Sequence, residues 1–375
     1  MIYVQHLLGI GHLRRTSFLA DALAKHDFEV NLVTGGMPVS DLSLQGINCH
    51  QLPPMRSLDG QFDQFVDEFG DLINADWKQQ RCNRLLKLFD DLSPDALITE
   101  TFPFGRRMMR FELLPLLKAA RQQAASPLVI SSLRDILQPK SKPERDQEIH
   151  QLVESYFDKI LVHGDERYAT LGDTYSLASE IAHKTFYTGY ISEPANSEQI
   201  RPDSENEVLV SGGGGAVSLQ LLKTAIDARP LSKLNRHTWR LLAGQGIDAH
   251  SFEQLQKAAG TGIIVERNRS DFQALLKQSA VSVSQAGYNT VCDILRTGVR
   301  AVMVPFSDAD EAEQSLRTRL LQQHNRVISL EQHALSAESL ATAVDLAIDM
   351  PQPSIDMRMD GANVSAGLLH EWLNV

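Results

Sequence analysis

The chain has 375 residues, of which 43% are hydrophobic and 22% charged. This content excludes intrinsic disorder as the main state, and the length suits two domains of typical size. Lys and Arg number 36 against 47 Asp and Glu, which gives a net charge of −11. That balance argues against a protein that binds nucleic acid mainly through its phosphates.

The cysteines and the N-terminal residues favour a soluble cytoplasmic protein. Cys49, Cys82 and Cys292 are scattered and form no C-x-x-C pair, so neither a disulfide framework nor a zinc knuckle is expected. The first residues lack the basic region of a signal peptide. No uninterrupted apolar stretch is long enough to span a bilayer.

Short β-branched runs alternate with longer helical patterns, which predicts an α/β fold with parallel sheets. A polar, acidic stretch at 192–207 contains two prolines and divides the pattern. We expect an N-terminal domain over 1–190, a linker over 191–206, a C-terminal domain over 207–350, and a helix within 351–375 that can pack back on the first domain. The expected strands are 2–5, 29–33, 96–99, 128–131, 159–162, 207–210, 238–242, 263–265, 280–283 and 301–304, with a helix over 12–25.

The turn after the first strand puts a histidine at the start of a helix. Gly9 and Gly11 open the approach to His12, and the helix dipole favours the neutral imidazole that a general base needs. The alternative is a histidine that caps its own helix. Arg14 and Arg15 follow in the first turn, where cations oppose the dipole, and this placement makes more sense if an anion binds nearby.

Two turns in the second half lead from a strand into a helix N-terminus. Four consecutive glycines, Gly212–Gly215, suit the close approach of a phosphate to bare amides, with a flexible turn as the alternative. The turn is no Walker A loop, and Val217 stands where a dinucleotide motif needs its third glycine. A second small-residue turn, Ser284–Gly287, enters a helix near Tyr288 and favours anions in the same way.

In order and spacing, these turns resemble those of GT-B glycosyltransferases. The segments are Gly11-His12, Gly212–Gly215, Ser284–Gly298, and Val304-Pro305-Phe306 followed by Glu313-Gln314. The chain is most similar to family 28, the MurG-like members, over its first residues and most of its C-terminal half. The resemblance implies two Rossmann-like parallel-sheet domains that face an inter-domain cleft, where strand carboxyl ends meet.

The resemblance also implies roles for single residues. His12 corresponds to the base that deprotonates the acceptor hydroxyl, Asp293 to a carboxylate that holds the nucleotide ribose, and Glu313 and Gln314 to contacts of the donor sugar. The residues expected along the donor diphosphate are Gly212, Gly213, Gly214, Gly215, Ala286, Gly287, Tyr288 and Asn289.

The acceptor side is expected to include residues near the base. Glu100 and Arg134 come at or after the ends of predicted strands and therefore near the cleft, together with Gly11 and Arg14. Asp135 is a candidate to orient His12, with an Arg134–Asp135 pair of purely structural use as the equal alternative.

The implied reaction is inverting, metal-independent transfer from a nucleoside-diphosphate sugar, with UDP as the expected nucleotide, to a hydroxyl acceptor. A lipid-linked or polysaccharide acceptor of the cell envelope would fit, and no cofactor is expected. Asp308-Ala309-Asp310 is a D-x-D sequence that we interpret as a solvated acidic helix start. Leu321 stands eight residues after Glu313, where retaining GT-B enzymes keep a second glutamate, which favours inversion.

Two alternative functions and the role of one basic surface segment remain as further hypotheses. The pattern from Gly9 to Arg15 also resembles the UDP-sugar hydrolase of pseudaminic acid synthesis. A degenerate, non-catalytic GT-B binding protein is the third hypothesis. The basic segment 104–123 could rest on an anionic membrane surface, which would give a peripheral association, or could be a core-facing helix with a solvated basic edge.

Overall fold

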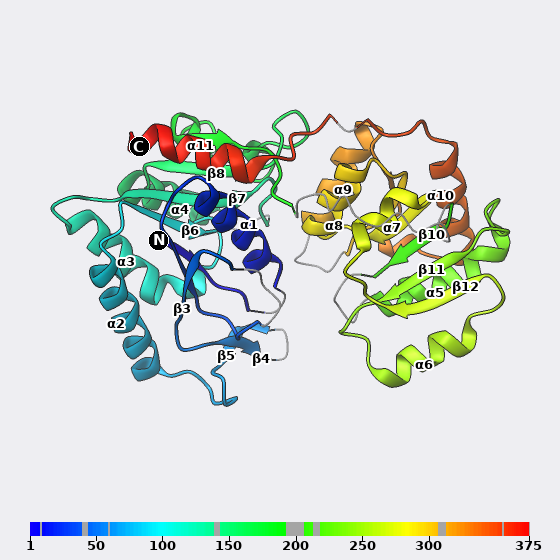
Figure 1. The fold of residues 1–375 in the computed structure, drawn as a ribbon, viewed down its shortest axis with the longest axis horizontal. Helices are drawn as coiled ribbons and strands as arrows, with labels where there is room; N and C mark the ends of the chain where they lie inside the picture. The colour runs from blue at the N-terminus through cyan, green and yellow to red at the C-terminus, as the bar shows by residue number, and fades with distance from the viewer. Residues whose placement is uncertain are drawn as a thin grey trace. The chain divides into compact units, whose positions relative to one another are not determined.

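The computed structural model describes residues 1–7, 10–39, 44–58, 61–138, 143–192, 206–212, 218–306, 313–354 and 356–374. The chain forms two compact units. Unit 1 comprises Met1–Ile191 together with Arg358–Val375, and unit 2 comprises Ser192–Met357 (Figure 1). The C-terminal segment therefore returns to the unit that contains the N-terminus.

Unit 1 is built on a seven-stranded sheet in the order β3-β2-β1-β6-β7-β8-β9, in which all neighbours pair in parallel. Its central strands are buried along almost their whole length, as parallel strands covered on both faces must be. The strands are β1 (Ile2–Val4), β2 (Val30–Thr34), β3 (Ile47–Gln51), β6 (Ala96–Glu100), β7 (Leu128–Arg134), β8 (Lys159–His163) and β9 (Thr185–Tyr187).

Helices cover both faces of this sheet with separate apolar clusters. Leu13, Leu19 and Leu23 of α1 pack with Leu369 of α11 in one cluster, whereas the other contains Leu85 and Phe89 of α2 and Leu113 and Leu117 of α3. These helices are α1 (Gly11–Lys25), α2 (Ala75–Leu92), α3 (Arg110–Gln122), α4 (Pro143–Tyr156) and α11 (Gly361–Leu373), and an antiparallel pair, β4 (Arg56–Leu58) and β5 (Gln61–Val66), lies outside the main sheet.

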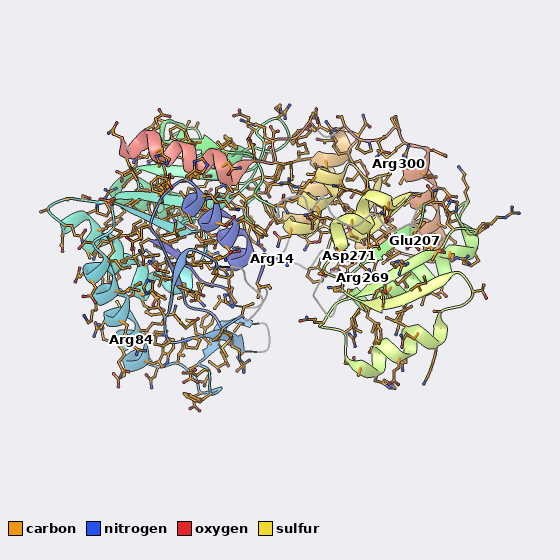
Figure 2. All side chains as sticks on the ribbon, in the orientation of Figure 1. Arg14, Arg84, Glu207, Arg269, Asp271 and Arg300 are labelled. Carbon is orange, nitrogen blue, oxygen red and sulfur yellow. The ribbon has the colours of Figure 1, made fainter. Side chains whose placement is uncertain are left out.

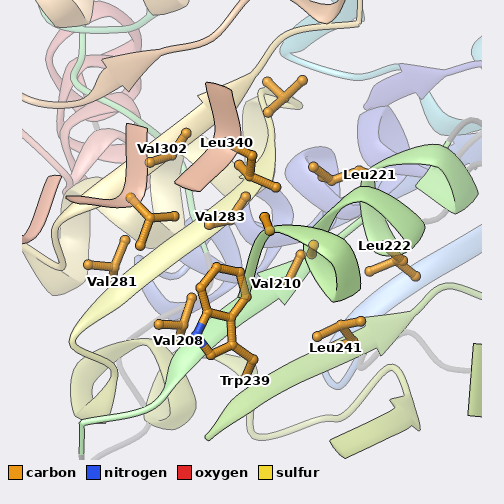
Figure 3. Close-up of a cluster of buried hydrophobic side chains, with 14 of the residues drawn as sticks. Val208, Val210, Leu221, Leu222, Trp239, Leu241, Val281, Val283, Val302 and Leu340 are labelled. Atoms are coloured by element: carbon orange, nitrogen blue, oxygen red, sulfur yellow. The ribbon is translucent and has the colours of Figure 1, made fainter. Parts of the chain in front are cut away.

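Unit 2 is a second parallel sheet, of six strands in the order β12-β11-β10-β13-β14-β15. Its core surrounds Trp239, which is fully buried and lies among Val208, Val210 and Val281 (Figure 3). The elements are β10 (Val208–Ser211), β11 (Trp239–Ala243), β12 (Ile263–Arg267), β13 (Val281–Gln285), β14 (Ala301–Val304), β15 (Ile328–Ser329), α5 (Ser218–Ala228), α6 (Ala249–Ala258), α7 (Phe272–Gln278), α8 (Tyr288–Thr297), α9 (Glu313–Gln323) and α10 (Ala337–Asp349).

The sequence predicted the central strands of both sheets and the edge strand β12, but not the other three edge strands. The ten expected strands are all present within a few residues of the predicted bounds. The short or polar strands β3, β9 and β15 were missed, as was helix α2, because their side chains alternate weakly or carry many charges. Edge strands bury one side only, which weakens their hydrophobic pattern.

Within the basic segment 104–123, the apolar face of the helix belongs to the core. Leu113, Leu116 and Leu117 of α3 are fully buried, and the helix continues through Pro115. Arg110 pairs with Glu148, and Arg121 with Asp158, which leaves Lys118 and Arg107 on the exposed edge. The helix therefore has the core-facing arrangement, and its apolar side is not offered to a membrane. Among the described residues no helix is long and apolar enough to cross one.

Candidate active site

Each sheet has one place where the strand order reverses direction, and the loops after the two strands that flank it diverge. In unit 1 this switch point lies between β1 and β6, and in unit 2 between β10 and β13. Ligands of open α/β sheets bind outside the carboxyl ends of the strands at such points. The predicted site residues on the loops after β1, β6, β10 and β13 therefore lie where ligands of this fold class bind.

His12 stands in the first turn of α1, and its partner comes from the end of β6. The His12 Nδ1 atom lies 2.7 Å from Oε1 of Glu100. Glu100 is 1% exposed, whereas His12 keeps 20% of its side chain exposed, so the carboxylate is out of reach of solvent while the imidazole can meet a substrate. We call His12, Arg15, Glu100 and Arg134 the His12 site.

The hydrogen bonds of His12 determine which ring nitrogen carries the proton. Arg134, at the end of β7, has its Nη2 atom 3.2 Å from Nε2 of His12. A guanidinium only donates, so Nε2 accepts and the proton is on Nδ1, which donates to Glu100. The lone pair of Nε2 is therefore the one available to accept a proton from a substrate.

Several groups converge on the Glu100 carboxylate. Arg15 donates to the same oxygen as His12, and Thr101 Oγ1 does so at 2.7 Å. Burial opposes the charge of Glu100, but His12 and Arg15 outweigh this effect and lower its pKa. Burial lowers the pKa of His12 as well, with Arg134 adding to the shift and Glu100 opposing it. His12 is thus neutral at pH 7, the protonation state that the sequence predicted, with burial as the largest cause among these.

Asp135 was the predicted orienting group, and the structure gives that position to Glu100 instead. Asp135 is fully buried and accepts hydrogen bonds from Tyr190 Oη at 3.1 Å and from the Ile136 amide at 2.9 Å. A side chain at Gly164 would meet the Asp135 Cβ at 2.4 Å. Asp135 is therefore packed into the loop that follows β7. The partner of His12 is Glu100, which ends the neighbouring strand β6.

Two other residues predicted for the acceptor side, Gly11 and Arg14, lie at the start of α1. Gly11 is the first residue of the helix, and Ile10 before it makes no side-chain cap. Arg14 is exposed on the first turn (Figure 2). No acidic residue occupies that turn, so the helix dipole and Arg14 both favour an anion here. Gly9 lies outside the described residues.

In unit 2, helix α8 begins at the switch point with its amides uncapped. Gly287 is the N-cap residue, no side chain caps the helix, and the first turn has no acidic residue. A Cβ atom at Gly287 would meet nothing within 4 Å, so packing does not require a glycine there. Ala286 and Tyr288 are buried, and Asn289 is partly exposed. The start of α8 is thus a helix N-terminus with no side-chain cap from the described residues, a feature that can bind phosphate.

The first glycine of the tetraglycine turn has a different physical reason. A Cβ atom at Gly212 would lie 2.0 Å from the Cβ of Ser218, the first residue of α5. The close packing of the helix on the strand end therefore demands glycine at this position, independently of any ligand. Gly213, Gly214 and Gly215 lie outside the described residues.

The residues predicted to contact the ribose and the donor sugar already have protein partners. Gln273 Nε2 donates to Oδ1 of Asp293 at 2.8 Å. Arg317 donates to Glu313 at 2.8 Å, one helical turn away. Gln314 accepts the Phe306 amide at 3.0 Å through Oε1. The last contact uses the carbonyl of Gln314 to hold the end of the loop after β14.

No group of three or more metal-ligating side chains occurs among the residues that the structure describes. The D-x-D sequence at Asp308 and Asp310 lies outside them. Sequence reasoning missed that Arg15 and His12 donate to the same oxygen of Glu100. The i, i+3 spacing of Arg15 from His12 puts both on one helix face, and this signal was available.

The family comparison supports the C-terminal half most directly. Residues 208–367 match the model of the glycosyltransferase family 28 C-terminal domain. An uncharacterised glycosyltransferase of Methanopyrus kandleri is 27% identical over 177 residues, which are 45% of this chain and 47% of the relative. The UDP-N-acetylglucosamine–N-acetylmuramyl-(pentapeptide) pyrophosphoryl-undecaprenol N-acetylglucosamine transferase of Bacillus subtilis is 26% identical over 147 residues, 39% of this chain and 40% of the relative. The chain spans about half the length of the curated relatives it matches.

Solved structures match the whole chain. MurG of Acinetobacter baumannii has a TM-score of 0.62 and 13% identity, with 99% of both chains covered. The glycosyltransferase of kitacinnamycin has a TM-score of 0.62 and 14% identity, with 99% of this chain and 98% of that one covered. These likenesses show the fold: the protein has the GT-B architecture of paired parallel-sheet units. The resemblance seen in the sequence is therefore confirmed for the C-terminal half, which matches the family 28 C-terminal domain, and for the GT-B fold.

Proposed function

We propose that this protein transfers a sugar from a nucleoside-diphosphate sugar to a hydroxyl acceptor, with inversion at the anomeric carbon. The observation that carries the proposal is the 2.7 Å contact between His12 Nδ1 and the buried carboxylate of Glu100. Because Arg134 donates to Nε2, we infer that the proton is on Nδ1. A neutral imidazole held in this tautomer has the lone pair that a general base needs.

In the proposed reaction the acceptor oxygen attacks the anomeric carbon while the bond from that carbon to the diphosphate oxygen breaks. The acceptor proton passes to Nε2 of His12, and the leaving nucleoside diphosphate takes the bonding electron pair. His12 then carries a positive charge, which the Glu100 carboxylate stabilises through Nδ1. Arg15 and Thr101 hold the carboxylate in place.

Unit 2 is proposed to bind the donor. The uncapped amides at Gly287 and the dipole of α8 suit the diphosphate, whose negative charge grows as the bond breaks. Gln314 keeps its amide nitrogen for the donor sugar while its carbonyl holds Phe306. Asp293 would reach the ribose only after sharing or leaving its bond to Gln273.

The finer parts of the proposal are a UDP nucleotide, no metal, and an acceptor of the cell envelope. The relative in Bacillus subtilis is named as a transferase of N-acetylglucosamine from UDP to a lipid-linked acceptor, which supports a UDP-sugar as the first donor to test. Backbone amides can stabilise a leaving diphosphate without a cation, which supports metal independence.

The test is a turnover assay of the purified protein with a panel of UDP-sugars, with and without candidate acceptors, and with EDTA. UDP release that depends on an acceptor and survives EDTA supports the proposal. Stoichiometric release of free sugar without acceptor would instead indicate a nucleotide-sugar hydrolase. Binding of UDP-sugars with no turnover, unchanged in His12→Ala, would indicate a non-catalytic binding protein.

A further inference from the structure

A second charged pair lies in the interior of unit 1, outside the His12 site. Arg81 of α2 and Glu112 of α3 are both fully buried. Arg81 Nε donates to Oε2 of Glu112 at 2.8 Å and Nη2 donates to Oε1 at 2.9 Å, and the Tyr3 hydroxyl also donates to Oε1. Burial opposes the charge of Arg81, but Glu112 and Tyr3 outweigh this effect and raise its pKa. The guanidinium therefore stays charged.

The other donors of Arg81 go to loops. A guanidinium has five N–H donors in a fixed planar arrangement. Nη1 donates to the carbonyl of Gly35 at 3.0 Å and to that of Pro53 at 2.7 Å. Nη2 donates to Oε1 of Gln5 at 2.6 Å in addition to its bond with the carboxylate. An arginine that served only to pair with Glu112 would not need these three bonds.

The three loop segments lie at the carboxyl edge of the sheet, which is also the edge of the His12 site. Residues 5–7 follow β1, residues 35–37 follow β2, and residues 53–57 run into β4. We call these segments the Arg81 loops. The first of them leads toward α1, whose first turn carries His12. Arg81 is thus connected with the proposed base through the chain itself.

The Arg81 loops pack closely around the guanidinium. A Cβ atom at Gly35 would lie 2.0 Å from Nη2 of Arg81 and 2.3 Å from Oε1 of Gln5, so only glycine lets the backbone approach this closely. The Gly35 carbonyl also accepts the Met55 amide at 3.0 Å, and the Ser57 amide donates to the loop after β1 at 3.2 Å. The loops therefore bond to one another as well as to Arg81, and their positions are coupled.

Stability alone does not explain a buried pair of this kind. The cost of taking two charges out of water can exceed their attraction, and apolar side chains of similar volume often replace a buried pair without loss of stability. Apolar side chains cannot supply directed hydrogen bonds to the oxygens of Gly35, Pro53 and Gln5. What Arg81 adds is therefore the position of these loops.

We propose that Arg81, held by Glu112, is a positioning residue that fixes the Arg81 loops and so places the start of α1, with His12, for the acceptor hydroxyl. The proposal rests on the proposed function, because it takes His12 as the base. Arg81 touches no reacting atom and acts only through the loops. A displacement of about 1 Å caused far from the chemistry can lower a rate about 10²-fold.

The first arm of the test is hydrogen exchange of the full chain, followed by mass spectrometry. Arg81→Lys keeps a positive charge beside Glu112, but one ammonium cannot reach the carboxylate and all the loop oxygens. Exchange of the Met55 and Ser57 amides, whose bonds join the loops, is expected to become about tenfold faster or more, while β6 and β7 exchange as in the wild type.

The second arm is steady-state kinetics. Arg81→Lys is expected to lower kcat about 10- to 100-fold, with KM for the donor unchanged, because the donor is proposed to bind unit 2. Arg84→Lys is the matched control, since Arg84 lies three residues further along α2 and is exposed (Figure 2). It should match the wild type in both arms.

Three results would overturn the proposal. One is wild-type exchange of the Met55 and Ser57 amides in Arg81→Lys. Another is faster exchange spread equally over the loops, β6 and β7, which would mark a general loss of stability. The third is an unchanged kcat in a variant whose loops exchange faster.

If Arg81→Lys does not fold, the triple variant Arg81→Met/Glu112→Leu/Tyr3→Phe takes its place. It removes both charges and the hydroxyl that would lose its acceptor, and it is expected to fold with the same local rise in exchange. Wild-type exchange, or failure to fold, would count against a positioning role. Failure of the proposed function shows separately, as absence of donor turnover in the wild type, because the exchange arm needs no reaction.

Discussion

In unit 1 the loops at the switch point carry charged side chains that already hydrogen-bond to one another, whereas in unit 2 the corresponding loop into α8 presents backbone amides and a glycine. His12, Glu100 and Arg134 come from three different elements and lie within 3.2 Å of their partners. Gly287 has no side chain to position and no neighbour that requires it to be glycine. Proton transfer needs groups held in one protonation state, while a diphosphate needs only an array of donors, and the two units differ accordingly.

The largest expected effect is at His12. His12→Ala should lower kcat about 10²- to 10⁴-fold by removing the base, while the affinity for UDP stays unchanged. Steady-state kinetics and UDP titration measure both. His50→Ala is the control, since His50 lies on the edge strand β3 and contacts Asn31. A His12→Ala enzyme with full activity would remove the basis for the comparison.

The next effect separates the two candidate partners of the base. Glu100→Gln should lower kcat about 10²-fold, because the amide keeps the shape but loses the charge that stabilises imidazolium. Asp135→Asn should leave kcat within a few-fold of the wild type, since Asp135 bonds Tyr190 and its own loop. Equal losses in the two variants would mean that Asp135 also acts on His12.

The two glycines of unit 2 should respond in opposite ways. Gly212→Ala forces a Cβ to 2.0 Å from Ser218 and should lower the free energy of unfolding by about 1–3 kcal/mol. Gly287→Ala has open space and should cost less than about 1 kcal/mol, but should weaken UDP binding if phosphate approaches these amides. Denaturant unfolding and UDP titration are the measurements. Normal UDP binding by Gly287→Ala would argue against this helix as the diphosphate site.

The smallest change is expected in the pH profile. Because burial lowers the pKa of His12, the base form persists as the pH falls below 6.5, and kcat/KM should stay level from neutral pH into that range. Arg134 lowers this pKa and Glu100 raises it. The acid limb should therefore move to higher pH in Arg134→Met and to lower pH in Glu100→Gln. Shifts in the opposite directions would contradict the assigned protonation state.

Local pattern was enough to predict much of this molecule. The central strands are mostly apolar because both faces of the sheet are covered, so each was visible as a short hydrophobic run. Glycines and a histidine at strand-to-helix turns indicated the loops of the switch points without any knowledge of the strand order. The resemblance to GT-B glycosyltransferases followed from those loops.

The partner of the base could be decided only by the tertiary structure. Glu100 and Asp135 both come near strand ends in the sequence, and nothing local distinguishes them. The order β1-β6-β7 puts the end of β6 directly beside the loop from β1, so Glu100 reaches His12 and Asp135 packs under Tyr190. Which side chains meet depends on strand order and backbone direction, and both are set by contacts between residues far apart in the chain.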